Sequence, residues 1–270
     1  MNVYVFMPAR DEEKNLPATL NSLINQTLKP FKIVLINDAS IDRTGEIAES
    51  YGVDVINLTD RHKSYSSPER GWMLSGVWNH AFPVPDKTDY IMQTGSDVIL
   101  PLNYVEKLVG LMEQNNKLVI ASGMIKNEHF SSVRGVGRLY KAWYWNKYIG
   151  KFPRMYIGES YPLYKALSLG LHIQCFPELV MLTQRPTNLY KAKYGYAMRE
   201  LGYFPLYALA RCLMASLFSH KQGVMMLKTY LTGPFRQKDK DVSNFIRLYQ
   251  AKIIFRIRES LKNLVGRVLN

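Results

Sequence analysis

The stretch KIVLINDASIDRT, residues 32–44, decides the fold that the sequence predicts. Its first five residues form an uninterrupted apolar run, which is typical of strands buried on both faces of a parallel sheet. The run ends in a polar segment that begins with Asn37 and Asp38 and leads into a helical pattern around Ile47 and Ala48. A buried strand followed by a polar turn and a helix is the repeating unit of parallel α/β sheets.

The segments on either side follow the same order. Residues 3–8 predict a short buried strand ending at Pro8, and residues 53–56 predict a third strand. Between the first two strands, apolar residues recur at helical spacing at Leu16, Leu20, Leu23 and Ile24. The predicted order is therefore β-α-β-α-β, which implies parallel strands joined by right-handed crossovers.

Farther along the chain, the pattern predicts helices over 71–82 and 102–115 and strands over 89–94, 118–123 and 172–177. From about residue 187 the sequence is helical and basic to its end. We expect a catalytic domain over 1–205, with a nucleotide-binding half (1–100) and an acceptor half (101–205), and a helical extension over 206–270.

Composition narrows the class of protein. The chain has 270 residues, a net charge of +13 and two cysteines without metal-ligand spacing. The sequence contains neither G-x-G-x-x-G after the first strand nor G-x-x-x-x-G-K-[ST], so the dinucleotide fingerprint and the P-loop are excluded. It shows no signal peptide and no apolar run of about 20 residues, the length that a spanning helix needs. The expected compartment is therefore cytoplasmic.

Polar clusters that contain acids follow three of the predicted strands. They comprise residues 8–12, residues 37–44 and the triplet Gly95-Ser96-Asp97. Because ligands bind where parallel strands end, we expect one crevice lined by carboxylates. Without a phosphate-cradling loop, a hard divalent cation is the expected means of holding a diphosphate there.

The motifs in these segments resemble those of family 2 inverting glycosyltransferases, which have the GT-A fold. P-A-R-D-E-E-x-N-L-x-x-T-L-x-S-L-x-x-Q (8–26) and I-V-L-I-N-D-A-S-x-D-R-T (33–44) resemble the start of that family. G-S-D-V-I-L-P (95–101) matches its DxD region, and residues 158–173 are similar to its E-D-x-D-L-x-x-R-x-x-x-G motif. The resemblance covers residues 1–205. It implies an α/β fold with a Rossmann-like, mostly parallel sheet flanked by helices.

The resemblance also implies roles for individual residues. Asp38 would hydrogen-bond the nucleobase, Glu12 would lie near the ribose, Asp97 would ligate Mg²⁺ or Mn²⁺, and Glu159 would be the general base. The implied donor-binding set is Pro8, Ala9, Arg10, Glu12, Asp38, Arg70, Ser96, Asp97, Gln184 and Arg185. The implied donor is a UDP- or GDP-linked sugar, and the implied role is glycan, polysaccharide or glycolipid assembly.

Two positions depart from the family pattern. Gly95 replaces the first aspartate of DxD, so Asp97 alone would hold the metal. Ser160 replaces the usual catalytic aspartate, so Glu159 must take the proton instead, because serine cannot do so at neutral pH. Alternatively, Glu159 is a solvated surface acid, and the chain is a degenerate relative that binds nucleotide-sugar or glycan without turnover.

The acceptor and the basic extension leave alternatives open. Trp143 and Trp145 could stack on an acceptor sugar, or they could pack beneath the acceptor half. Residues 206–232 and 243–266 place apolar residues at helical spacing among Arg and Lys. That pattern suits a helix lying peripherally on an anionic membrane, and a lipid-linked acceptor would then be plausible. It equally suits a helical hairpin packed on the catalytic domain. Nucleic acid is not an expected partner, because no reading motif is present.

Overall fold

A computed structural model gives the fold of the chain. It describes residues 1–59, 70–128, 132–156, 158–185, 194–233 and 239–268, with only the backbone described for 70–73 and 257–268. The chain forms two compact units. Unit 1 comprises Met1–Arg154 and Gly158–Thr187, and unit 2 comprises Met155–Ile157 and Asn188–Asn270. The predicted functional division at residue 205 stays a prediction.

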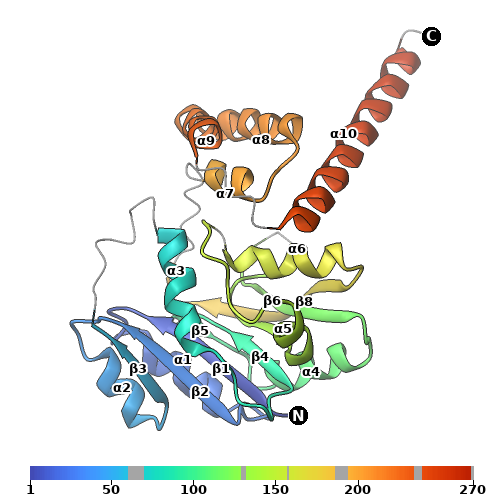
Figure 1. Cartoon of the computed structure of the whole chain (residues 1–270). Coiled ribbons are helices and arrows are strands. Elements are labelled where there is room, and N and C mark those ends of the chain that lie inside the picture. The colour runs from blue at the N-terminus through green and yellow to red at the C-terminus, as the bar shows by residue number, and fades with distance from the viewer. Residues whose placement is uncertain (60–69, 129–131, 157, 186–193, 234–238, 269–270) are drawn as a thin grey trace. The chain divides into compact units, whose positions relative to one another are not determined.

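Unit 1 contains one eight-stranded mixed sheet with the strand order β3-β2-β1-β4-β7-β6-β8-β5 (Figure 1). Strands β1, β2, β3 and β4 are mutually parallel, and β6 is parallel to β8, whereas the pairs β4–β7, β6–β7 and β5–β8 are antiparallel. The strands are β1 (Val3–Ala9), β2 (Lys32–Asp38), β3 (Asp54–Leu58), β4 (Tyr90–Gln93), β5 (Val98–Ile99), β6 (Leu118–Ile125), β7 (Arg138–Lys141) and β8 (His172–Thr183).

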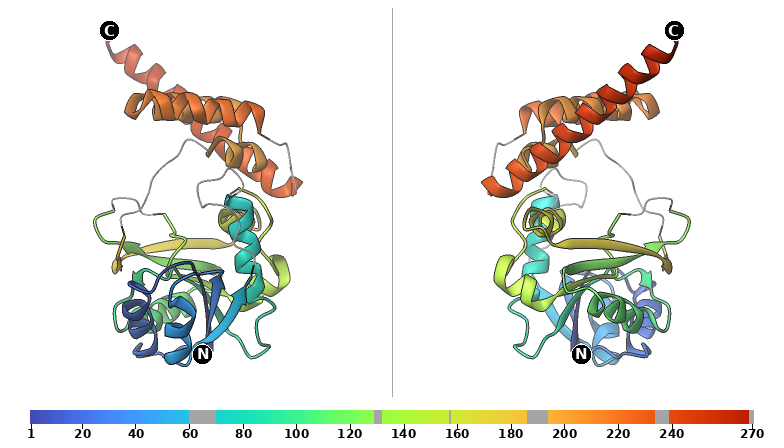
Figure 2. Two further views of the ribbon diagram at one scale, coloured as in Figure 1. Left: turned by 90° about the vertical axis from the view of Figure 1, so that its left-hand side faces the viewer. Right: turned by 90° about the vertical axis from the view of Figure 1, so that its right-hand side faces the viewer.

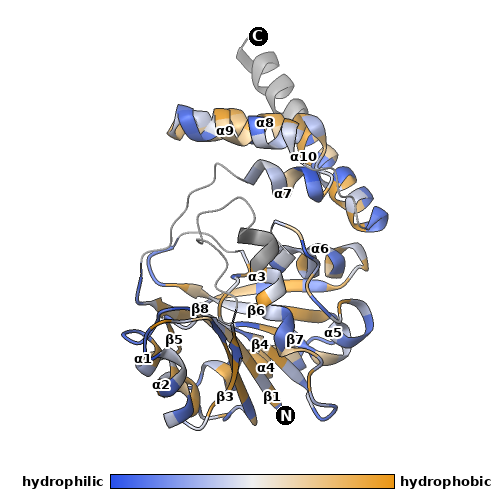
Figure 3. Cartoon of the chain, turned by 60° about the vertical axis from the view of Figure 1, so that its left-hand side comes forward, coloured by the Kyte–Doolittle hydropathy of each residue, from blue (hydrophilic) through white to orange (hydrophobic). Residues whose placement is uncertain are grey.

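Helices cover both faces of this sheet, as the alternation along β1 requires. Val5 and Met7 point into a core shared with α1 (Leu16–Ile24), α2 (Thr44–Ser50) and α4 (Tyr104–Glu113). Tyr4 and Phe6 point into a second core shared with α3 (Arg70–Trp78), α5 (Ala142–Tyr148) and α6 (Tyr161–Ser168). Figure 3 shows the hydrophobic colouring on the strands between these two helical layers. The predicted α/β class with a mostly parallel sheet is confirmed.

Among its described residues, unit 2 contains the helices α7 (Tyr194–Glu200), α8 (Pro205–Phe218), α9 (His220–Thr232) and α10 (Lys240–Val268). Helices α8 and α9 lie side by side (Figure 2). The Phe204 amide before α8 donates to Gln250 Oε1 of α10 at 2.8 Å, and Arg247 donates to the Gly202 carbonyl at 3.0 Å. Among the helices that the structure describes, none is long and apolar enough to cross a membrane.

Candidate active site

The loops that follow β1 and β2 are locked together by hydrogen bonds. The Glu12 amide donates to Thr44 Oγ1 at 2.7 Å, and the Glu13 amide donates to Asp42 Oδ2 at 3.0 Å. In the other direction, the Ile41 amide donates to Asp11 Oδ1 at 2.9 Å. Burial alone would raise the pKa of Asp42, but the hydrogen bonds that it accepts from Thr44 and from the Glu13 amide hold this pKa below its ordinary value. These hydrogen bonds therefore hold the two acidic loops against each other at the ends of β1 and β2.

A buried ion pair joins the same loops at their base. Arg10 Nη2 lies 2.5 Å from Asp38 Oδ2, and Arg10 Nε donates to the Asp38 carbonyl at 2.9 Å. Both side chains are almost wholly buried. Removing one partner of such a pair typically costs about 3–5 kcal/mol, because the other charge is left buried. Arg10 therefore fixes Asp38 at the end of β2.

Arg185 brings the ends of β1 and β4 together with that of β8. Its guanidinium pairs with Glu12 Oε1 and with Asp97 Oδ2, the latter at 3.1 Å from Nε. Burial raises the pKa of Glu12, and the hydrogen bond from Asn15 and the charge of Arg185 oppose that rise. Partial burial would lower the pKa of Arg185, but Glu12 and Asp97 raise it above its ordinary value. Two carboxylates from different strand ends thus share one cation.

Backbone contacts place Arg185 there. The Gln184 amide donates to the Asp97 carbonyl at 2.9 Å, which continues the pairing of β5 with β8. The Gln184 side chain donates to the Asn15 carbonyl at 2.9 Å and to Thr19 Oγ1 at 3.2 Å, at the start of α1. Thr19 Oγ1 in turn donates to the carbonyl of buried Ser96 at 2.9 Å. Gln184 and Ser96 therefore hold the framework around Asp97.

The Asp97 carboxylate is folded back over Gly95. A Cβ atom at position 95 would lie 2.9 Å from Asp97 Oδ1 and 3.4 Å from both Val136 and Val98. The space that the first acid of a DxD pair needs is therefore occupied by the second acid and by apolar neighbours. Gly95 fits this arrangement of Asp97, and an aspartate at position 95 would force the loop to rearrange.

Glu159 lies near the same loop, on the short 3₁₀ helix η2 (Gly158–Ser160). The Gly135–Val136 segment links the two acids, because Val136 packs against Gly95 and Gly135 packs against the Glu159 carboxylate. A Cβ atom at Gly135 would lie 2.7 Å from Glu159 Oε2. The carbonyl of Glu159 accepts a hydrogen bond from buried Arg138 at 2.7 Å, which anchors η2 to β7. The side chain of Glu159 is half-buried.

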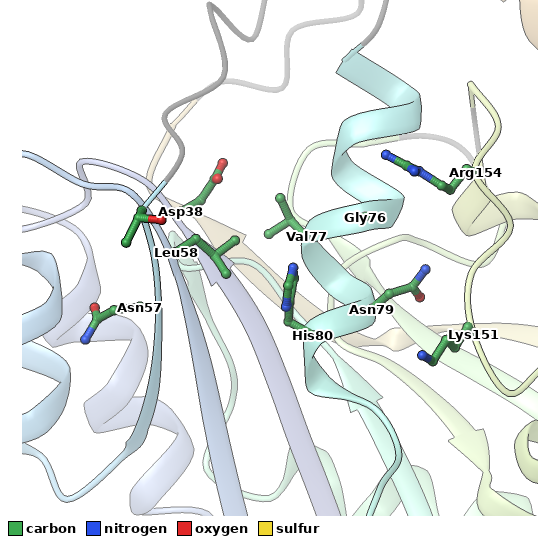
Figure 4. A pocket seen from close by; sticks show the side chains of 10 residues that line it. Asp38, Asn57, Leu58, Gly76, Val77, Asn79, His80, Lys151 and Arg154 are labelled. Atoms are coloured by element: carbon green, nitrogen blue, oxygen red, sulfur yellow. The ribbon is translucent and has the colours of Figure 1, made fainter.

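A pocket of about 530 Å³ opens beside Asp38 (Figure 4). Val77 and His80, from α3 and the 3₁₀ helix η1 (Asn79–Ala81), point toward the ends of β2 and β3. The lining also includes two basic residues, which Figure 4 places on the opposite side of α3. The full lining is Asp38, Asn57, Leu58, Thr59, Gly76, Val77, Asn79, His80, Lys151 and Arg154.

Sequence reasoning missed most of this lining and the supporting role of Arg138. Asn57 lies near the end of the third parallel strand and Thr59 follows it, so the strand-end rule that singled out Asp38 could have found them. Lys151, Arg154 and Gly135 carry no such signal, because only the tertiary fold brings their loops to the site.

The prediction that Trp145 stacks on an acceptor sugar is wrong. Trp145 has no exposed surface: it stacks on Phe82 at 4.8 Å and lies against Tyr140 and Phe152, so no face is open to a sugar ring. Trp143 on the same helix is 47% exposed and stays a prediction. The side chain of Arg70 lies outside the described residues, and Pro8 and Ala9 end β1 at the rim of the site.

The acidic side chains around Arg185 carry the oxygen donors that a hard divalent cation prefers. Glu12 and Asp97 present carboxylate oxygens to one shared positive charge, and oxygen donors are what Mg²⁺ and Mn²⁺ prefer. Within the described ranges, no three His, Cys, Asp or Glu side chains gather as a self-sufficient metal site. Asp97 could therefore hold a divalent cation only if the remaining ligands came from a bound diphosphate and water.

The parallel β-α-β half, the acids at its strand ends and the antiparallel extension define a GT-A type fold. The sequence model of glycosyl transferase family 2 matches residues 4–164, and the chain belongs to this inverting family. A 56-residue segment is 39% identical to 4,4'-diaponeurosporenoate glycosyltransferase of Staphylococcus aureus. That match covers 21% of this chain and only 15% of the relative.

Solved structures share the fold at low sequence identity. TarS 1–349 of S. aureus in complex with UDP-GlcNAc has a TM-score of 0.55 at 15% identity, covering 74% of this chain and 65% of that one. The mannosyltransferase PcManGT of Pyrobaculum calidifontis, in complex with GDP-Man and Mn²⁺, has a TM-score of 0.55 at 14% identity, covering 90% and 73%. The predicted GT-A fold is confirmed.

Proposed function

We propose that this chain transfers a sugar from a nucleotide-diphosphate donor to an acceptor hydroxyl with inversion. The observation that carries the proposal is the pair of carboxylates, Glu12 and Asp97, that share the Arg185 guanidinium near the strand ends of the sheet that also carries Asp38. The net charge of these three groups is negative, so they suit an anionic ligand that binds together with a divalent cation. A nucleoside diphosphate has that property.

The nucleoside would occupy the pocket beside Asp38. The volume of this pocket lies within the range of about 300–1,000 Å³ that is usual for small-molecule sites. Leu58 and Val77 offer apolar surface to a base, while Asp38 and Asn57 offer hydrogen-bonding groups. A carboxylate can accept an edge N–H of uracil or of guanine, so UDP- and GDP-sugars are both candidate donors.

The diphosphate would lie beside Asp97 and Arg185. Arg185 pairs with both Glu12 and Asp97. We propose that Arg185 turns toward the phosphates when the donor binds, leaving Asp97 to hold Mg²⁺ or Mn²⁺. When bound there, the metal would offset the negative charge that grows on the leaving diphosphate.

Glu159 is the proposed base. It would take the proton of the acceptor hydroxyl, whose oxygen would attack the anomeric carbon on the face opposite the leaving group. Arg138 holds the backbone of Glu159 and Gly135 bounds its carboxylate, so the base would be positioned by the fold. The proposed acceptor is a glycan or a lipid-linked sugar. The expectation that the basic extension contacts an anionic membrane likewise stays a proposal.

A panel of UDP- and GDP-sugars with Mn²⁺ and an acceptor extract tests this function through release of free nucleotide. We expect release to be lost in Asp97→Ala and retained in Asp86→Ala, which removes an exposed acid elsewhere in unit 1. Glu159→Gln should lower kcat by about 10²–10⁴-fold with donor KM little changed, whereas Glu178→Gln on β8 should leave kcat unchanged.

The alternative, that the chain is a degenerate relative of the family, is motivated by Gly95 and Ser160. It predicts a different result in the same experiment. It would bind a nucleotide-sugar in the presence of metal and release no nucleotide with any donor or acceptor. That result would replace the enzyme with a binding protein. Unchanged transfer by Glu159→Gln would remove Glu159 from the base role.

A further inference from the structure

Helix α8 turns an apolar stripe outward. Leu206, Leu209, Leu213 and Leu217 recur at i, i+3, i+7 and i+11, and all four are exposed. Phe218 at the end of the helix is 88% exposed and Leu217 is 79% exposed. Figure 3 shows this hydrophobic colouring along α8. An exposed, contiguous apolar stripe of this kind marks an interaction surface.

The stripe contains no charge. Arg211 is the one charged residue among the fourteen of α8, and its guanidinium lies over the Tyr194 ring of α7 at 5.0 Å. The opposite face of α8 carries Ala208 and Cys212, which are buried. The helix thus places its polar contact within unit 2 and its leucines outward, the reverse of an ordinary surface helix.

Helix α9 adds basic residues to the same hairpin. Lys221, Val224, Lys228 and Leu231 recur at i, i+3, i+7 and i+10, and all four are exposed. A Cβ atom at Gly223 would overlap Ser216, so the two helices pack too closely for any larger residue there. The hairpin is therefore a fixed unit that presents leucines from one helix and alternating lysine and apolar residues from the other.

The charge of the chain is concentrated in the same part. Residues 188–270 contain 15 Lys and Arg against 4 Asp and Glu, whereas residues 1–187 contain 20 against 18. A second copy of the chain would bring a surface of the same strong positive charge, and repulsion opposes that pairing. A nucleic acid would satisfy the charge but would leave the uncharged leucine stripe of α8 facing water.

We propose that the α8–α9 hairpin docks on the surface of an anionic lipid bilayer. The leucines and Phe218 would enter the boundary between headgroups and acyl chains, while Lys221 and Lys228 would meet lipid phosphates. The surface belongs to unit 2 alone, so this proposal goes beyond the proposed sugar transfer and does not depend on it.

Flotation of the full chain with phosphatidylcholine vesicles, with and without phosphatidylglycerol, tests this docking. We expect binding only to the anionic vesicles. The variant Leu213→Ser/Leu217→Ser/Phe218→Ser should weaken the partition coefficient at least about tenfold. Lys221→Gln and Lys228→Gln should each weaken it by about fivefold. Leu102→Ser, which removes a leucine 63% exposed in unit 1, is the matched control and should bind normally.

Two further readouts separate docking from misfolding. The serine variant should keep its thermal unfolding midpoint, since the replaced side chains are exposed. Phe218→Trp should show a blue shift of the added emission with anionic vesicles and none with neutral ones. Equal binding of both vesicle types, or full binding by the serine variant, would overturn the proposal. So would self-association that the serine variant abolishes, or heparin binding without vesicle binding.

Discussion

Ala39 adopts a left-handed backbone conformation, with φ of 51°, in the turn that follows β2. This left-handed conformation costs an L-residue roughly 1–2 kcal/mol of conformational free energy, whereas glycine adopts it without that cost. Asp11, in the matching turn after β1, has φ of 54° and uses its carboxylate to bind the Ile41 amide. Strained positions of this kind concentrate at binding sites, where the surrounding contacts hold them.

Ala39→Gly should therefore raise the free energy of unfolding by about 0.5–1 kcal/mol, after the added entropy of glycine in the unfolded chain is subtracted. The matched control is Ala48→Gly inside α2, which should lower that free energy by about 1 kcal/mol or more. Urea unfolding of the two variants measures both values. Equal destabilisation by the two changes would contradict the role of strain at Ala39.

The ion pair between Arg185 and Glu12 makes the stability of the folded chain depend on pH. Because burial raises the pKa of Glu12, its carboxyl is protonated at a higher pH in the folded chain than in the unfolded one, and stability from this group falls as pH rises through the folded pKa. The charge of Arg185 limits that rise. Arg185→Gln should raise the pKa of Glu12 further.

The stability difference between wild type and Arg185→Gln should therefore be small at acidic pH, where Glu12 is protonated, and grow as Glu12 ionises. Urea unfolding across the pH range from below the ordinary Glu pKa to neutrality measures it. Glu12→Gln should reduce the dependence, because Asp97 is then the remaining carboxylate paired with Arg185. A constant difference across the range would show that another group sets it.

At the scale of elements, the position of η2 depends on Gly135 in a neighbouring loop, because a side chain there would meet the Glu159 carboxylate. Gly135→Ala would place a methyl group against the Glu159 carboxylate, and the backbone of Gly135 needs no positive φ, so the strain falls on the base. We expect kcat to fall at least about tenfold with little change in donor KM. Gly110→Ala in α4, where a Cβ atom meets nothing within 4 Å, is the control and should keep full activity. Loss of donor binding in Gly135→Ala would contradict the assignment.

The elements that sequence patterns predicted are those with local signals. The apolar runs of β1, β2 and β3 and the leucine spacing of α1 predicted their type and order. Strand β7 was not predicted, because Arg138-Leu139-Tyr140-Lys141 reads as polar, yet both charged residues are buried in the middle of the sheet. Arg138 can be buried because the carbonyls of Arg134 and Glu159 accept its hydrogen bonds, and those contacts depend on the whole fold.

At the scale of the molecule, the rule that ligands bind at the ends of parallel strands predicts from sequence alone that Glu12 and Asp97 share one crevice. It could not place Arg185, since that residue reaches the crevice only through the pairing of β8 with β5. The same limit explains Trp145: aromatic residues suit both a sugar and a core, and only the positions of Phe82 and Phe152 decide between them.

The two compact units differ sharply in their balance of charge, which makes ionic strength a selective variable. Screening acts over about 8 Å at 0.15 M salt, so added salt weakens the attraction of unit 2 for distant anionic surfaces. The Arg10–Asp38 ion pair of unit 1 joins two side chains that are both almost wholly buried, and salt screens it far less. Added electrolyte alone should therefore reverse the proposed docking of the hairpin while the Arg10–Asp38 pair stays formed.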